Sequence, residues 1–201
     1  NATLEYQPGF IVSGASNKLQ VLIPAYNLGE DKILLDNVEG VMTEEDGKLY
    51  ISFATRVFDE SIETVSIVYQ HAFAPSTIIK TLPIYSIQLD KQGTYVNTET
   101  TLILNGRGIE NVLSIGFATT ECTNEIEMFT IDYTNVTVSI PMQGRDYHIC
   151  VQYEDATSLY FISSVDFDVV IVSSFNIQEW IEDLPLPTDI HINGLEKIQV
   201  S

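Results

Sequence analysis

The feature that most constrains the fold is a pattern in which two apolar segments flank a glycine, because the chain contains it three times. The copies are FIVSGASNKLQVLI at 10–23, TTLILNGRGIENVLSIGFATTEC at 100–122 and DIHINGLEKIQVS at 189–201. Their central glycines, Gly14, Gly106 and Gly194, lie roughly 90 residues apart. A period of that length fits one small β-sandwich per copy.

Other segments keep the same order at nearly the same period. LYISF at 49–53 matches VTVSI at 136–140, and TVSIVYQ at 64–70 matches YHICVQY at 147–153. The alternating run at 48–53 follows Asp46-Gly47, a pair that supplies the positive φ of a tight hairpin turn. We therefore expect modules at 1–83 and 84–173, with an edge strand and linker after residue 71 that close the first module and a boundary at 75–83. Residues 174–201 then contain the start of a third repeat or a linking hairpin.

Composition favours strands for most of the chain and a helix near its end. Apolar residues make up 45% of the 201 residues, and Val, Ile, Tyr, Phe and Thr are typical of strands. After residue 174 the apolar spacing becomes i, i+3, i+4 and i+7, which is helical, at Ile177, Trp180, Ile181 and Leu184. Asn176, with Glu179 three positions on, is a capping-box pattern. We predict a short helix at 177–183.

The charge balance excludes two classes of partner. Nine basic against 28 acidic residues give a net charge of −19, which opposes binding to nucleic acid or to anionic membranes. No stretch approaches the roughly 20 apolar residues of a membrane span, and the first residues lack the pattern of a signal peptide. We expect no direct membrane insertion, and a secreted protein whose signal was removed or lies outside this sequence fits equally well.

The two cysteines and two short motifs bear on the compartment. Cys122 and Cys150 allow one disulfide, which would stabilise the fold by about 3.6 kcal/mol in the chain-entropy model; the alternative is a pair of buried thiols. Asn1 and Asn135 each begin an Asn-x-Thr sequon for N-glycosylation. If both features are used, the protein is extracellular or at the cell surface.

Residues 84–173 resemble the IPT/TIG module, an immunoglobulin-like domain. The resemblance rests on the Gly-Arg-Gly at 106–108, on Cys122, and on the Pro-x-x-Gly turn formed by Pro141 and Gly144 before an alternating strand. Residues 1–83 lack the cysteine and that turn, and resemble a divergent immunoglobulin-like module. The resemblance implies tandem β-sandwiches that act as spacers, interaction domains or dimerisation domains. It implies no catalytic residues.

A search for reactive groups gives no catalytic or metal site. His71, His148 and His191 lie in separate segments, and only His148 has a cysteine nearby, Cys150, with no further ligand evident. Asn105-Gly-Arg-Gly lacks the lysine of a phosphate loop, so its glycines are interpreted as turns between strands. We expect no enzyme activity and no cofactor.

Clusters of adjacent acidic residues lie in expected turns or at the helix end, and none has the spacing of a calcium-binding EF-hand loop. They are Glu30-Asp31, Glu44-Glu45-Asp46, Asp59-Glu60 and Glu182-Asp183. Solvation of exposed turns explains these clusters, and calcium bridging between modules is the alternative.

The leading hypothesis is a non-enzymatic extracellular structural or adhesion protein whose partners are other proteins or its own copies. The alternative is a carbohydrate-binding surface protein, which would need exposed aromatic side chains; Tyr147, Tyr153 and Tyr160 are candidates, although alternation favours their burial. The terminal hairpin at 188–201 is either a piece of a longer array or a link in a head-to-tail fibre. Its apolar side chains would form that contact: Ile190, Ile192, Leu195, Ile198 and Val200.

Overall fold

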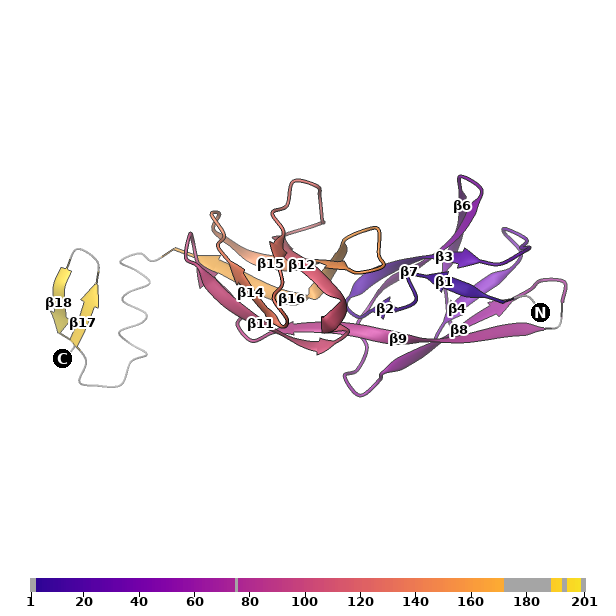
Figure 1. The fold of residues 1–201 in the computed structure, drawn as a ribbon, viewed down its shortest axis with the longest axis horizontal. Helices are drawn as coiled ribbons and strands as arrows, with labels where there is room; N and C mark the ends of the chain where they lie inside the picture. The colour runs from indigo at the N-terminus through magenta and orange to yellow at the C-terminus, as the bar shows by residue number, and fades with distance from the viewer. Residues whose placement is uncertain (1–2, 75, 172–188, 193–194, 200–201) are drawn as a thin grey trace.

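The computed structural model describes residues 3–74, 76–171, 189–192 and 195–199. These residues form β-strands and one 3-10 turn, η1 (Ile109–Asn111). Figure 1 shows two β-sandwiches lying end to end, with the long strand β9 (Thr77–Leu89) running from one into the other. Nowhere in the described ranges is there a helix long and apolar enough to cross a membrane.

The first sandwich contains two sheets. Its strands besides β9 are β1 (Glu5–Gln7), β2 (Ile11–Val12), β3 (Ala15–Leu22), β4 (Lys32–Leu35), β5 (Val38–Glu39), β6 (Val41–Glu45), β7 (Lys48–Arg56) and β8 (Thr64–Gln70). One sheet has the order β1-β3-β7-β6, and the facing sheet has the order β9-β8-β4-β5. β2 pairs in parallel with β9.

The second sandwich is built in the same way. Its strands besides β9 are β10 (Gly93–Tyr95), β11 (Thr100–Arg107), β12 (Val112–Ala118), β13 (Phe129–Thr130), β14 (Asn135–Val138), β15 (Gly144–Tyr153) and β16 (Tyr160–Val170). β14-β11-β9 form one face and β10-β16-β15-β12-β13 the other. β10 pairs in parallel with β16, whereas β16 pairs antiparallel with β15, and β15 pairs antiparallel with β12.

Both sandwiches have the strand order of an immunoglobulin domain. In the letter scheme of that fold, one sheet carries A, B, E and D, and the other carries G, F and C. The order β1-β3-β7-β6 corresponds to A-B-E-D, and β9-β8-β4-β5 to G-F-C-C′. In the second sandwich the orders are A-B-E and A′-G-F-C-C′. The all-β, tandem immunoglobulin-like fold is confirmed, and β9 is strand G of the first sandwich and strand A of the second.

Local sequence explains the strands that were predicted best. β8 has the predicted bounds, and its burial alternates residue by residue because one face packs on the core while the other faces solvent. β6 and β7 form the predicted hairpin. Asp46 has φ 51° and Gly47 has φ 75° at its turn, the left-handed values that an Asp-Gly pair tolerates.

The boundary stretch at 75–83, expected to contain an edge strand and a linker, is strand from Thr77 onward. β9 begins at Thr77 and continues through Pro83 without a break. The Ile84 N–H donates to the Glu63 carbonyl oxygen beside β8, at 2.9 Å. Successive N–H groups of a strand point to opposite sides, so the nitrogen of Pro83 faces away from β8, and its missing hydrogen costs no bond in that ladder.

The glycine-centred copies occupy different places in the two sandwiches. Gly14 lies between β2 and β3, whereas Gly106 lies inside β11. Their predicted equivalence is wrong, because an apolar run, a glycine and a second apolar run can arise at any close approach of strands. The other two matches are correct: β7 and β14 are both strand E, and β8 and β15 are both strand F.

The terminal segment is described only in part. β17 (Asp189–Ile192) and β18 (Leu195–Gln199) pair antiparallel, as the predicted hairpin requires. Asn193 and Gly194 lie outside the described residues, as does the predicted helix at 177–183.

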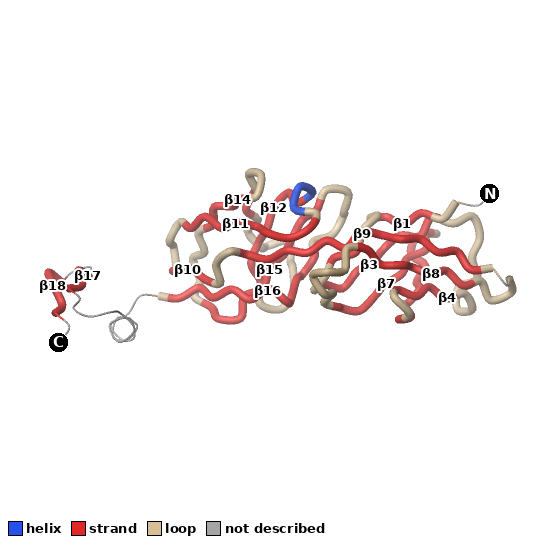
Figure 2. The backbone as a smooth tube through the Cα atoms, turned by 90° about the horizontal axis from the view of Figure 1, so that it is seen from below, coloured by secondary structure: helices blue, strands red, loops and turns tan. Residues whose placement is uncertain are grey.

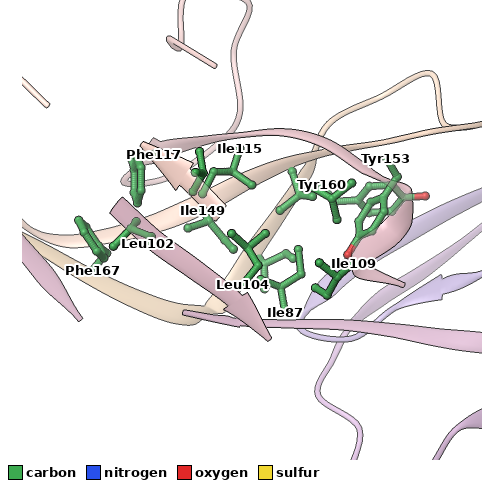
Figure 3. Packing of buried hydrophobic residues seen from close by; sticks show 14 of the residues in the cluster. Ile87, Leu102, Leu104, Ile109, Ile115, Phe117, Ile149, Tyr153, Tyr160 and Phe167 are labelled. Carbon is green, nitrogen blue, oxygen red and sulfur yellow. The ribbon is translucent and has the colours of Figure 1, made fainter. Parts of the chain in front are cut away.

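Two clusters of buried apolar side chains fill the sandwiches. The cluster that fills the second sandwich also includes Phe10, Val12 and Ala15, which lie in the sequence at or before the start of β3, the first long strand of the first sandwich. Figure 3 shows this cluster, with Tyr153 and Tyr160 gathered at one end of it. The N-terminal segment therefore contributes to the core of the second sandwich.

Candidate functional site: the junction between the two sandwiches

The junction is organised around the middle of β9. Its first half pairs with β8, from Thr77 to Pro83, and its second half pairs with β11, from Ser86 to Leu89. Figure 2 shows the same strand crossing between the two bodies from a second direction. A continuous, paired strand cannot swivel as a flexible loop does, because rotation would break ladder hydrogen bonds.

Arg107 connects the two sandwiches through side-chain hydrogen bonds. It lies at the end of β11, and its guanidinium donates to the carbonyl oxygens of Ile62 and Glu60, the latter at 2.5 Å. The carboxylate of Glu63 lies 3.6 Å from the same guanidinium. The fork geometry of arginine suits two acceptors at once. One side chain of the second sandwich thus holds the loop between β7 and β8 of the first.

Two glycines of the Asn105-Gly-Arg-Gly motif let this segment lie close to β9, Gly106 against its backbone and Gly108 against a side chain. A Cβ on Gly106, which has φ 138°, would lie 2.0 Å from the Ser86 carbonyl oxygen on β9. A Cβ on Gly108, at φ 75°, would lie 2.4 Å from the ring of Tyr85. Gly108 turns the chain into η1, but Gly106 lies inside a paired strand, so the interpretation of both glycines as turns is wrong for Gly106.

An aromatic cluster lies under the junction. The ring of Phe10 stacks on Tyr85 with centroids 4.3 Å apart, and Tyr153 lies 5.3 Å from Phe10. The Asn111 side-chain amide donates to the Tyr85 hydroxyl at 3.0 Å. Burial raises the pKa of Tyr160 to about 12 and that of Tyr153 above its usual value. Both tyrosines are core residues and form no exposed aromatic strip.

Backbone contacts join β3 and β16 beside this cluster. The Ser163 N–H donates to the Gly14 carbonyl oxygen at 3.0 Å, and the Gly14 N–H donates to the Arg56 carbonyl oxygen at 2.8 Å. A Cβ on Gly14 would lie 2.1 Å from the Ser164 hydroxyl oxygen. The Ser13 hydroxyl accepts from the Phe58 N–H at 2.9 Å. Gly14 thus serves the contact between sandwiches, a role that its place in the sequence pattern did not indicate.

Cys122 and Cys150 form a disulfide, with Cα atoms 5.8 Å apart. Cys150 is buried on β15 and pairs with Gly116 on β12, on the face of the sheet away from the core. The segment after Cys122 covers that face, since a Cβ on Gly116 would lie 2.7 Å from atoms of Ile126 and Met128. The bond holds this segment against the sheet, and the alternative of two buried thiols is wrong.

The described histidines lie far apart in the fold. His71 follows β8 and lies 3.5 Å from the carboxylate of Asp31, and His148 lies on β15 with its Nδ1 3.1 Å from the Val165 carbonyl oxygen. The side chain of His191 is outside the described residues. Within the described part of the chain, no group of three or more His, Cys, Asp or Glu side chains has the geometry to hold a metal ion.

Asp31 is a buried carboxylate, although its place in an acidic pair predicts a solvated turn residue. Its side chain has no exposed surface, and burial alone would raise its pKa. Backbone N–H groups of Ala72 and Asn27, both at 2.9 Å, and the Tyr69 hydroxyl at 3.0 Å outweigh burial, with His71 adding to them. The pKa of Asp31 is therefore lowered, and its carboxylate ties two loops together.

The remaining predicted residues fall on the surface or outside the described part. Asn135 begins β14, and both Asn135 and Thr137 are exposed, as a glycosylation sequon requires. Asn1 is outside the described residues. Nothing is described of the side chains proposed for subunit contacts, which are Ile190, Ile192, Leu195, Ile198 and Val200.

No known protein-family model matches the sequence, and no curated protein sequence does. Solved structures resemble it at low identity. The extracellular region of plexin A4 gives a TM-score of 0.41 at 11% identity, over 84% of this chain and 16% of that chain. The tandem immunoglobulin repeats of Dlar give 0.32 at 6%, over 86% and 97%.

A third similar structure is the SGBP-B protein of the Bacteroides ovatus mixed-linkage glucan utilization locus, in complex with a mixed-linkage heptasaccharide. It gives a TM-score of 0.29 at 16% identity, over 82% of this chain and 44% of that chain. The chain therefore spans less than half the length of this protein and of plexin A4. The assignment of the immunoglobulin-like fold rests on the strand order of the chain itself.

Proposed function

We propose that this chain is a non-catalytic extracellular structural module that holds the segments attached to it at a fixed distance and angle. The observation that carries the proposal is β9, which is one unbroken strand shared by two sandwiches. Tandem domains usually move relative to one another unless their interface is large and apolar. Here a paired strand replaces the linker, and Phe10, Val12 and Ala15 pack across the junction.

The disulfide supports an extracellular location. Such bonds persist in oxidising compartments and are rare in the cytosol, where thiols are kept reduced. Exposure of Asn135 on β14 is compatible with glycosylation there. The separation of His71 from His148, each with its own local partner, supports a role without catalysis.

Within the immunoglobulin-like folds, we assign the second sandwich to the IPT/TIG type. Gly106 and Arg107 end β11 and Gly108 turns the chain into η1, and Gly144 begins β15 after Pro141. β14 forms the sheet edge, with no strand D beyond it in the described part. An experimental structure in which a strand D pairs with β14 would contradict this assignment.

Distances between spin labels test the rigid junction. The Gln70→Cys and Tyr133→Cys changes place one label on each sandwich at exposed sites. Leu22→Cys, combined with Gln70→Cys, gives a control pair within the first sandwich. We expect the distribution between sandwiches to be as narrow as that of the control pair.

Variants of Arg107 identify what fixes the angle. Arg107→Ala removes the hydrogen bonds to Ile62 and Glu60 and is expected to widen the distribution between sandwiches while leaving the control pair unchanged. Arg107→Lys keeps the positive charge but loses the forked guanidinium that reaches two acceptors, so the distance distribution should have an intermediate width. A broad or two-peaked distribution in the unmodified chain would show that the sandwiches move independently and would refute the proposal.

A further inference from the structure

A polar groove lies where the second sandwich overhangs the first. Its volume is about 860 Å³, within the range of ligand sites in proteins. The floor is the outer face of β1, β3 and β7, and the wall is the turn that joins β15 to β16. Figure 1 shows this turn pointing toward the first sandwich. The groove exists only because β9 fixes the two sandwiches end to end, so that this turn lies next to the first sandwich.

The floor carries a row of planar polar groups. Gln7 pairs with Gln20, and Gln20 pairs with Tyr50, so the three residues lie next to one another across three strands. Their neighbours Leu19, Val21 and Ile51 are buried in the core, which places the row on the opposite, solvent-facing side. Directly opposed side chains on one face have Cβ atoms about 5 Å apart. The row therefore presents two amides and a phenol ring at neighbouring positions.

The wall adds hydroxyl and carboxylate groups. Asp155, Thr157 and Ser158 lie in the turn after β15 and line the groove together with Leu159. Asp155 has φ 68°, in the left-handed region that Asp tolerates. Amides, hydroxyls and a carboxylate facing each other across a cleft can donate to and accept from a ligand with many hydroxyl groups.

The charges of the groove cancel although the chain as a whole is strongly acidic. Two basic residues, Lys18 and Lys48, and two acidic ones, Glu45 and Asp155, line the groove, while the net charge of the chain is −19. The long-range field repels anionic ligands, and the local balance gives no strong pull on a cation. A neutral, polar ligand fits both conditions.

The Lys18 side chain covers the ring of Tyr50 and can move away from it at a small cost in free energy. The Lys18 ammonium lies 4.8 Å from the ring centroid and 2.8 Å from a carboxylate oxygen of Glu45. About half of each of these charged side chains is exposed, and exposed ion pairs contribute little to stability. The same electron-rich face that attracts the ammonium can pack against the C–H groups of a sugar ring.

We propose that this groove binds a neutral oligosaccharide, with Tyr50 as the stacking surface and Gln7, Gln20 and the turn at 155–158 as hydrogen-bonding groups. This goes beyond the structural role, because it gives the junction a ligand. A peptide is a poorer occupant. The central floor strand β3 is paired on both sides, with β1 and β7, so it offers no free backbone ladder for strand addition.

The test is titration of the ¹⁵N-labelled full chain with a panel of neutral hexasaccharides of α- or β-linked glucose, mannose, xylose and galactose, followed by NMR. We expect one or more of them to shift the side-chain amide signals of Gln7 and Gln20. Tyr50→Ala and Gln20→Ala should each weaken that binding at least tenfold. Matched controls are Tyr133→Ala, which removes a tyrosine that is 90% exposed in another part of the fold, and Gln70→Ala on β8. Both controls should bind as the unmodified chain does.

Three results would overturn the proposal: no hexasaccharide shifts the groove signals, binding is unchanged in Tyr50→Ala and Gln20→Ala, or an unstructured peptide of mixed sequence shifts the same signals more strongly than any sugar. Each of these results leaves the rigid junction untouched, because that is measured by label distances without any ligand.

Discussion

Phe10→Ala tests whether the N-terminal segment belongs to the second core. Phe10 is 5% exposed and packs on Tyr85, Tyr153 and Tyr160, with ring centroids 4.3 to 6.1 Å away. Replacing a buried phenylalanine by alanine costs about 3 to 5 kcal/mol, and more where neighbours cannot collapse into the space. Tyr85 is held by Asn111 through its hydroxyl, so we expect a cost of about 4 kcal/mol.

Hydrogen exchange of individual backbone amides measures this loss of stability in each sandwich separately. Core amides exchange through opening of the structure around them, and about 4 kcal/mol corresponds to a roughly 700-fold change in the opening equilibrium. We expect that acceleration at Ile149 and Val151 on β15, with a smaller effect at Ile67 on β8.

Phe73→Ala, at a phenylalanine that is 77% exposed, serves as the control and should change neither sandwich. Position in the chain would instead place Phe10 in the first sandwich alone. If Phe10→Ala accelerates exchange at Ile67 and leaves Ile149 and Val151 unchanged, the argument for a shared core is wrong.

Two further predictions concern the disulfide and the buried carboxylate. Replacing Cys122 and Cys150 together by serine should lower the free energy of unfolding by about 3 to 4 kcal/mol and expose the segment after residue 122 to protease, as measured by denaturant unfolding and by mass spectrometry of the digest. Asp31 has a lowered pKa in the folded state, so its contribution is complete above the unfolded-state pKa of about 3.9 and is lost as pH falls through the folded-state value. In Asp31→Asn the acid-dependent loss of stability should be smaller, and an unchanged pH profile would show that the network around Asp31 is not what titrates.

The sequence contains few patterns that would predict the junction between the two sandwiches. Arg107 was noted only as part of a glycine-rich motif, and its acceptors are backbone carbonyl oxygens, which any residue carries. The one available signal was the run of strand-forming residues on both sides of Pro83. A proline between two such runs suggests a boundary, although proline is compatible with a strand wherever its nitrogen faces away from the ladder.

The sequence alone determined what depends on neighbouring residues. Period-two alternation set the strands such as β8, Asp46-Gly47 set the hairpin of β6 and β7, and composition set the all-β class, because these follow from local φ, ψ preference and from one-sided burial. Tertiary structure alone decided the roles of Gly14 and Gly106, the buried state of Asp31, and the union of the two sandwiches through β9. Those depend on contacts between residues far apart in the chain, and the alternation of a strand carries no information about which strand will lie beside it.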